Sequence, residues 1–153
     1  MENRLNENDR VLFRIIYLLR RLIDRWASLN LSKVAAQEFN VTFLPYFMNI
    51  GEDGVSNHDL VKTIKVTKQG VSKTVKELEN LGLVYTEKND TDARSIMIYL
   101  TEAGRTLFNV IKEHSDGLHD EYRKLVGTKN FELMVDTLLK IIDFHERIEK
   151  EVP

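Results

Sequence analysis

The chain has 153 residues, of which 42% are hydrophobic, and a formal net charge of −2. This length and composition suit one compact domain, residues 1–153, with a sizeable core. The absence of cysteine excludes disulfides, thiolate metal sites and thiol-based redox sensing. The polar start, MENRLNENDR, and the lack of a long apolar run predict a soluble cytoplasmic protein without a signal peptide or membrane-spanning helix.

A long amphipathic helix is predicted over residues 10–29. Apolar side chains recur at helical spacing from Leu12 to Trp26, and arginines line the opposite face. An apolar face of this length needs a partner, either the core or a second subunit. A helix lying on a membrane surface is the alternative, because Trp and Arg suit that position, although Asp24 opposes contact with anionic lipid.

Two further short helices and a basic one follow in the sequence. Residues 41–50 predict a short buried helix whose first turn holds Pro45. After the turn GEDG, Ser56 and the acid three residues later form a capping pattern for a helix that ends near Lys65. Thr67 is then the expected N-cap of a third helix, which Gly82 closes.

The spacing of apolar residues changes after the third helix. Residues 83–88 and 95–100 alternate and are rich in β-branched and aromatic side chains, which predicts a β-hairpin with a turn at 89–94. Thr101 caps a helix over residues 102–122, and a break near Gly127 separates it from a last amphipathic helix at residues 130–150.

Positive charge is concentrated in the segment that holds the third helix and the end of the helix before it. Residues 61–80 hold five Lys against two Glu, a local +3, whereas residues 41–60 and 127–153 are locally −3 and −2. The predicted exposed face carries no acid and consists of Gln69, Ser72, Lys73, Lys76 and Asn80. These side chains suit base edges and phosphates, although a solvated lysine face on an ordinary surface helix is the alternative. Gly70 is costly within a helix and indicates close approach to the preceding helix or to DNA.

The order helix, turn, helix, hairpin describes a winged helix-turn-helix. Three motifs at family spacing strengthen this interpretation: LENLGLV at residues 78–84, Asp92-Ala93-Arg94 in the wing, and LTEAGR at residues 100–105. On these motifs the chain resembles the MarR family of bacterial transcription regulators. The resemblance implies a mainly α fold with a small β-hairpin wing.

The resemblance also implies a homodimer formed by helices at residues 8–29 and 102–151, around a DNA-binding lobe at residues 41–101. Such a dimer would bind a pseudo-palindromic double-stranded operator, usually as a repressor, and a small aromatic or anionic effector would release it. Asp92 would orient Arg94, and Arg94 would enter the minor groove. The predicted DNA-binding residues are Lys65, Thr67, Lys68, Gln69, Ser72, Lys73, Lys76, Asp92 and Arg94.

The wing departs from the family pattern. Ala93 stands where many members carry a second Arg, and residues 87–94 hold three acids against two bases, a local −1. A winged-helix protein-interaction adaptor without specific DNA binding is therefore the alternative function.

Other chemistries find little support in the sequence. It contains no signature motif of a metalloprotease, a nucleotide-binding loop or a serine hydrolase, and His114 and His119 miss the spacing that puts two ligands on one helical face. We therefore predict no enzyme activity, catalytic residue, metal site or cofactor. The aromatic segment from Phe43 to Met48 could line an effector pocket or pack in the core, and no ligand-binding residue is assigned.

Overall fold

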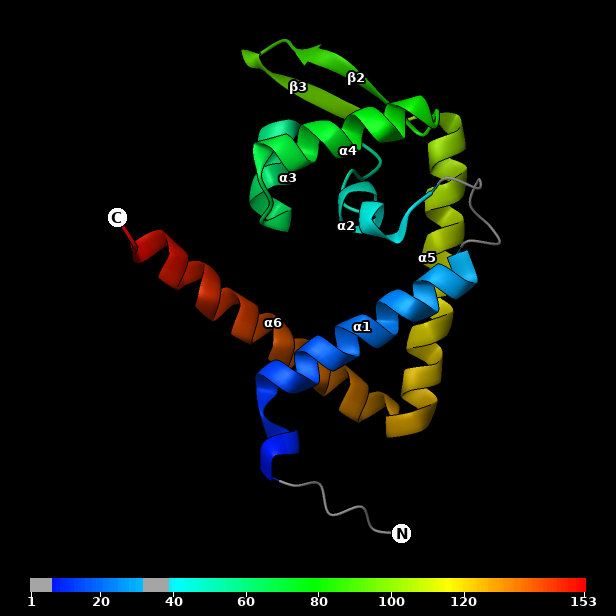
Figure 1. Cartoon of the computed structure of the whole chain (residues 1–153), viewed down its shortest axis with the longest axis vertical. Coiled ribbons are helices and arrows are strands. Elements are labelled where there is room, and N and C mark those ends of the chain that lie inside the picture. The colour runs from blue at the N-terminus through cyan, green and yellow to red at the C-terminus, as the bar shows by residue number, and fades with distance from the viewer. Residues whose placement is uncertain (1–6, 32–38) are drawn as a thin grey trace. The chain divides into compact units, whose positions relative to one another are not determined.

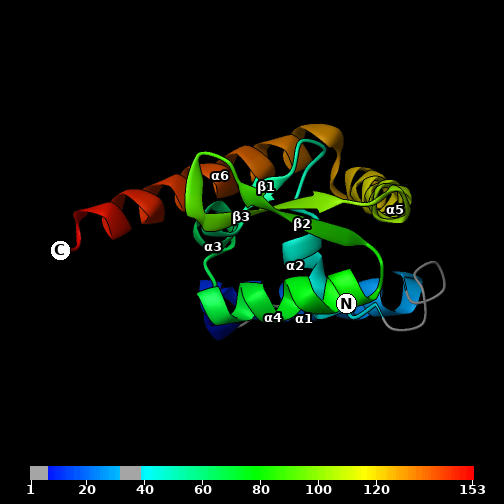
Figure 2. The ribbon, with the colours of Figure 1, turned by 90° about the horizontal axis from the view of Figure 1, so that it is seen from above.

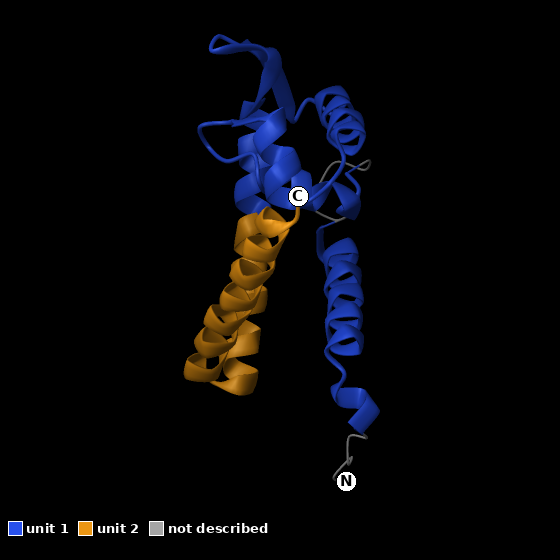
Figure 3. Ribbon diagram, turned by 90° about the vertical axis from the view of Figure 1, so that its left-hand side faces the viewer, with its two compact units in different colours: residues 1–111 blue, residues 112–153 orange. Residues whose placement is uncertain are grey.

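The computed structural model of the chain describes residues 7–31 and 39–153. It divides into two compact units, residues 1–111 and 112–153 (Figure 3). The described residues are mostly helical and contain one small antiparallel sheet, so the predicted fold class is confirmed.

The first long helix, α1 (Leu12–Leu31), starts and ends two residues later than predicted. A short 3₁₀ helix, η1 (Glu7–Arg10), precedes it and was not predicted, because four polar residues carry no apolar period. Near the end of α1, Ala27 and Leu31 are buried. The rest of the helix exposes large apolar side chains, including Phe13 at 89% exposure and Leu19 at 46%.

Three short helical segments lead to the basic helix (Figure 1). They are η2 (Val41–Phe43), α2 (Leu44–Phe47), which has Pro45 in its first turn, and α3 (Asn57–Ile64). The Ser56 hydroxyl oxygen accepts a hydrogen bond of 3.0 Å from the Asp59 amide, which confirms the predicted cap. The basic helix itself is α4 (Lys68–Asn80).

The hairpin consists of β2 (Val84–Asn89) and β3 (Asp92–Leu100). A third strand, β1 (Val55–Ser56), pairs with β3 through Val55 and Ile98, so the sheet order is β1-β3-β2 (Figure 2). Sequence reasoning predicted only the hairpin, because a strand of two residues has no alternation to recognise.

The core of the first unit lies between these elements. Its most deeply buried side chains come from α2 and the turn after it, α3, α4 and the sheet: Phe47, Ile50, Leu60, Leu78, Ile98 and Val71. The apolar face of α4 is therefore held against the sheet and the short helices, which leaves its polar face outward.

Two long helices complete the chain. The first is α5 (Glu102–Val126), which runs across the division between the units, and the second is α6 (Thr128–Glu151). Gly127, with φ of 87°, makes the predicted break between them. Phe131 is buried at 4% exposure beneath the Arg123 guanidinium, which lies 4.6 Å from the ring centroid and pairs with Glu132 at 3.2 Å. Within the described residues no helix is long and apolar enough to cross a membrane.

Candidate nucleic-acid interface

The α4 helix begins where the sequence indicates. The Thr67 hydroxyl oxygen accepts a hydrogen bond of 3.0 Å from the Gly70 amide, as expected of an N-cap. Val71, Val75 and Leu78 are buried on one side of the helix. The exposed side carries five of the predicted site residues: Lys68, Gln69, Ser72, Lys73 and Lys76.

These five side chains make no hydrogen bond or ion pair within the described part of the chain. Their donors and charges are therefore available to an outside partner. The two acids of the helix lie on its flanks, and Glu79 accepts a hydrogen bond of 3.3 Å from the Thr86 hydroxyl of β2. The helix thus presents a cationic polar face of the kind that binds phosphates and base edges.

Gly70 makes the close approach predicted from its position. A Cβ at Gly70 would lie 3.1 Å from the Tyr46 hydroxyl and 3.2 Å from the Thr67 hydroxyl oxygen. The neighbour is therefore α2, and not the helix immediately before α4. Tyr46 supports the N-terminal end of α4 from inside the lobe.

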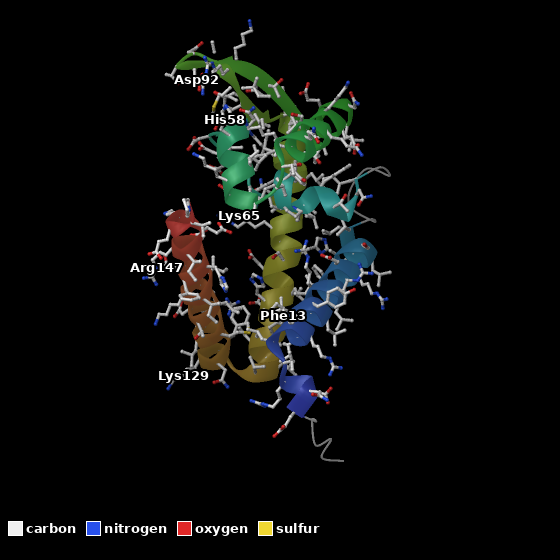
Figure 4. All side chains as sticks on the ribbon, turned by 60° about the vertical axis from the view of Figure 1, so that its left-hand side comes forward. Phe13, His58, Lys65, Asp92, Lys129 and Arg147 are labelled. Carbon is white, nitrogen blue, oxygen red and sulfur yellow. The ribbon has the colours of Figure 1, made fainter. Side chains whose placement is uncertain are left out.

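The turn between α3 and α4 adds cations to the same segment. Lys65 has a left-handed backbone with φ of 56° and closes α3 through a bond from its amide to the Val61 carbonyl. Figure 4 labels it at the opposite end of α3 from His58. Lys62 is also exposed in the last turn of α3. The predicted site does not include Lys62, although the same run of lysines indicates it.

The wing tip has a defined backbone. The Asp92 carboxylate accepts a hydrogen bond of 3.0 Å from the Arg94 amide, and the Asn89 side-chain oxygen accepts one of 3.1 Å from the Thr91 amide. Asp92, labelled at the end of the hairpin in Figure 4, therefore fixes the backbone that carries Arg94. The Arg94 guanidinium has no hydrogen bond or ion pair within the described residues.

Sequence reasoning missed two residues, one that attaches the wing to the lobe and one that holds the wing together near its tip. The Asn57 side-chain oxygen accepts a hydrogen bond of 3.2 Å from the Ile96 amide, which joins the start of α3 to β3. Ser95, 3% exposed, accepts a bond of 2.9 Å from the Asn89 side-chain amide at the base of the tip. Neither residue belongs to a motif, so only the fold reveals its contact.

The aromatic segment packs mainly in the core. Phe43 is 8% exposed and Phe47 is fully buried, with ring centroids 5.5 Å from Phe39 and 6.2 Å from Phe108. A small hollow of about 180 Å³ lies beside Phe43, with Glu77, Asn80 and Leu81 in its wall. Among the described residues, no group of three His, Asp or Glu side chains is arranged to hold a metal ion.

A helix-turn-helix whose second helix turns a cationic polar face outward, followed by a hairpin with an arginine at its tip, defines the winged helix-turn-helix class. Known proteins agree with this assignment. A profile of the MarR family matches residues 45–95. YdgJ of Bacillus subtilis, described as an uncharacterized HTH-type transcriptional regulator, is 26% identical over 97 residues. That match covers 63% of this chain and 59% of the length of YdgJ.

Solved structures share the fold over most of the chain. The crystal structure of MarR superimposes with a TM-score of 0.79 at 15% identity, over 94% of this chain and 96% of that chain. A MarR family regulator from Listeria monocytogenes, solved in complex with 26mer DNA, gives a TM-score of 0.77 at 20% identity and covers 88% of each chain. Over residues 45–95 the chain is similar to the MarR family, and over most of its length it shares the fold of these solved structures.

Proposed function

We propose that this chain is a homodimeric transcription regulator that binds double-stranded DNA. In this proposal α4 enters the major groove and the wing lies against the adjacent minor groove. The observation that carries it is the exposed face of α4, where Lys68, Lys73 and Lys76 stand beside Gln69 and Ser72 without partners in the described part of the chain. The structure from Listeria monocytogenes that shares this fold was solved in complex with 26mer DNA, which supports DNA as the partner.

Each residue type has a separate role in this proposal. The lysines would neutralise DNA phosphates, and Arg94 would neutralise the negative electrostatic potential of the minor groove. Such contacts supply affinity and salt dependence but little sequence information. Gln69 and Ser72 would meet base edges, since an amide side chain can pair with adenine and a hydroxyl with several bases. Thr67 caps α4 and Asp92 shapes the wing tip. Thr67 and Asp92 would act mainly by fixing the backbone conformation of the neighbouring residues that contact DNA.

The dimer is proposed from the unpaired apolar faces of the long helices. Leu19 of α1 is 46% exposed, and Leu139 and Ile142 of α6 are 58% and 53% exposed. Soluble monomers rarely leave the apolar faces of long helices this exposed, and a second copy of the chain would cover them. A two-fold dimer would present two copies of α4 to a pseudo-palindromic operator, with half-sites about 10 base pairs apart.

From the resemblance to the MarR family we further propose that the protein represses transcription in the cytoplasm. A small aromatic or anionic effector would release it from DNA.

A protein-interaction adaptor is the second candidate function, favoured by the wing itself. Residues 87–94 hold three acids and two bases, so the hairpin adds no net positive charge to the face. An adaptor would bind all DNA weakly, with dissociation constants of about 10⁻⁴ to 10⁻⁶ M at physiological salt.

Fluorescence anisotropy separates the two functions. The purified protein is titrated onto DNA from upstream of its own gene, and onto a scrambled duplex of the same length, at two salt concentrations. The regulator predicts salt-sensitive binding that is at least about 10³-fold selective for the natural duplex. Equal weak binding to both duplexes, and to fragments recovered by genome-wide selection, would favour the adaptor.

A further inference from the structure

Thr101 joins the end of the DNA-reading segment to the start of α5. Its hydroxyl donates a hydrogen bond of 2.6 Å to the Gly82 carbonyl, and its amide donates one of 3.0 Å to the Leu83 carbonyl. The same hydroxyl oxygen accepts a bond of 3.0 Å from the Gly104 amide, which caps α5. One side chain therefore holds both the segment that leaves α4 and the first turn of α5.

The Gly82–Leu83 segment, to which Thr101 is hydrogen-bonded, is itself hydrogen-bonded to α4. The Gly82 amide donates to the Glu79 carbonyl at 2.9 Å, and the Leu83 amide donates to the Leu78 carbonyl at 3.0 Å. Gly82 has φ of 74°, the left-handed conformation that closes a helix. A continuous set of hydrogen bonds thus runs from the last turn of α4 to the first turn of α5.

Gly104 allows this joint to close. It is buried, and a Cβ at this position would overlap the carbonyl oxygen of Leu83 and lie 3.0 Å from its carbonyl carbon. The obstructing atoms are backbone, so no side-chain rotation could relieve the overlap. Any larger residue must move the start of α5 away from the Gly82–Leu83 segment.

We propose that Thr101 and Gly104 are positioning residues for DNA recognition: they set the direction of α4 relative to the start of α5 without touching DNA. The inference rests on the proposed function. Base readout tolerates only small errors in geometry, whereas phosphate contacts to flexible lysines tolerate larger ones. Loosening the joint should therefore reduce selectivity for the operator more than general DNA affinity.

The test uses the full-length protein and four variants. Thr101→Val removes both side-chain hydrogen bonds at nearly constant volume, and Thr101→Ser retains them. Gly104→Ala forces the joint apart. Gly117→Ala is the matched control, because it lies in the same helix and, beyond its chain neighbours and the adjacent helix backbone, no described atom comes within 4 Å of its added Cβ. Each variant is measured for dimer mass, urea unfolding midpoint, and affinity for a selected operator and for scrambled DNA.

We expect Thr101→Val and Gly104→Ala to remain folded dimers at the assay temperature. Their selectivity for the operator over scrambled DNA should fall at least about tenfold, which is roughly the effect of one mismatched base pair. Thr101→Ser and Gly117→Ala should keep the wild-type selectivity. Folded Thr101→Val dimers with unchanged selectivity would overturn the inference. Equal losses on both DNAs that follow the unfolded fraction would also overturn it. A wild-type protein without selectivity would instead overturn the proposed function and the inference with it.

Discussion

Lys76 provides a quantitative test of the cationic face on α4. The side chain is exposed and has no partner among the described residues, so Lys76→Ala removes a charge without disturbing the core. A dimer carries two copies. Because each lost phosphate contact changes the slope of log K against log salt by about 0.9, the slope of the variant should be shallower by about 1.8. Between about 50 and 200 mM salt, the affinity gap between wild type and variant should therefore shrink about tenfold.

The assay is anisotropy across that salt range on operator and scrambled DNA. Lys129→Ala on α6 is the control, because it changes the net charge equally but lies outside the winged-helix lobe. Its slope should match that of the wild type. Parallel slopes for Lys76→Ala and wild type on both DNAs would refute the assignment of α4 as the phosphate-contacting helix.

Three further changes test other parts of the account. Gln69→Ala should relax preference at particular base pairs by about 1–3 kcal/mol while leaving affinity for random DNA unchanged, and a binding-site selection with unaltered preferences would contradict this. Phe47→Ala, in the centre of the buried core, should lower the unfolding free energy in urea by about 3–5 kcal/mol, whereas a loss below about 1 kcal/mol would contradict its packing. Leu139→Glu should shift sedimentation toward the 17.9 kDa monomer while Lys140→Glu remains dimeric; equal behaviour of both would argue against α6 in the interface.

The helical framework could be predicted because local chemistry determines it. Ser56, Thr67 and Gly127 mark helix boundaries by caps and backbone preferences that act within a few residues. The outward face of α4 also followed from the helical period, since Val71, Val75 and Leu78 had to be buried. For these elements the sequence contained the physical cause of the structure.

Contacts between distant segments were the part that could not be predicted. The strand β1 exists only because Val55 pairs with Ile98, and the bond between Asn57 and the Ile96 amide joins residues 39 positions apart. Gly104 illustrates the same difficulty. The LTEAGR motif alone indicates no contact for Gly104. In the fold its α-carbon lies against the Leu83 carbonyl.

Selection of bound fragments from genomic DNA tests whether the protein recognises a specific DNA sequence. Fragments are incubated with the native protein at physiological salt, and those retained are sequenced. A sequence-specific dimer should strongly enrich a two-fold symmetric sequence with half-sites about 10 base pairs apart, and it should lose that enrichment when Gln69 and Lys73 are both replaced by Ala. Recovery of unrelated fragments in proportion to their abundance would contradict a sequence-specific regulator.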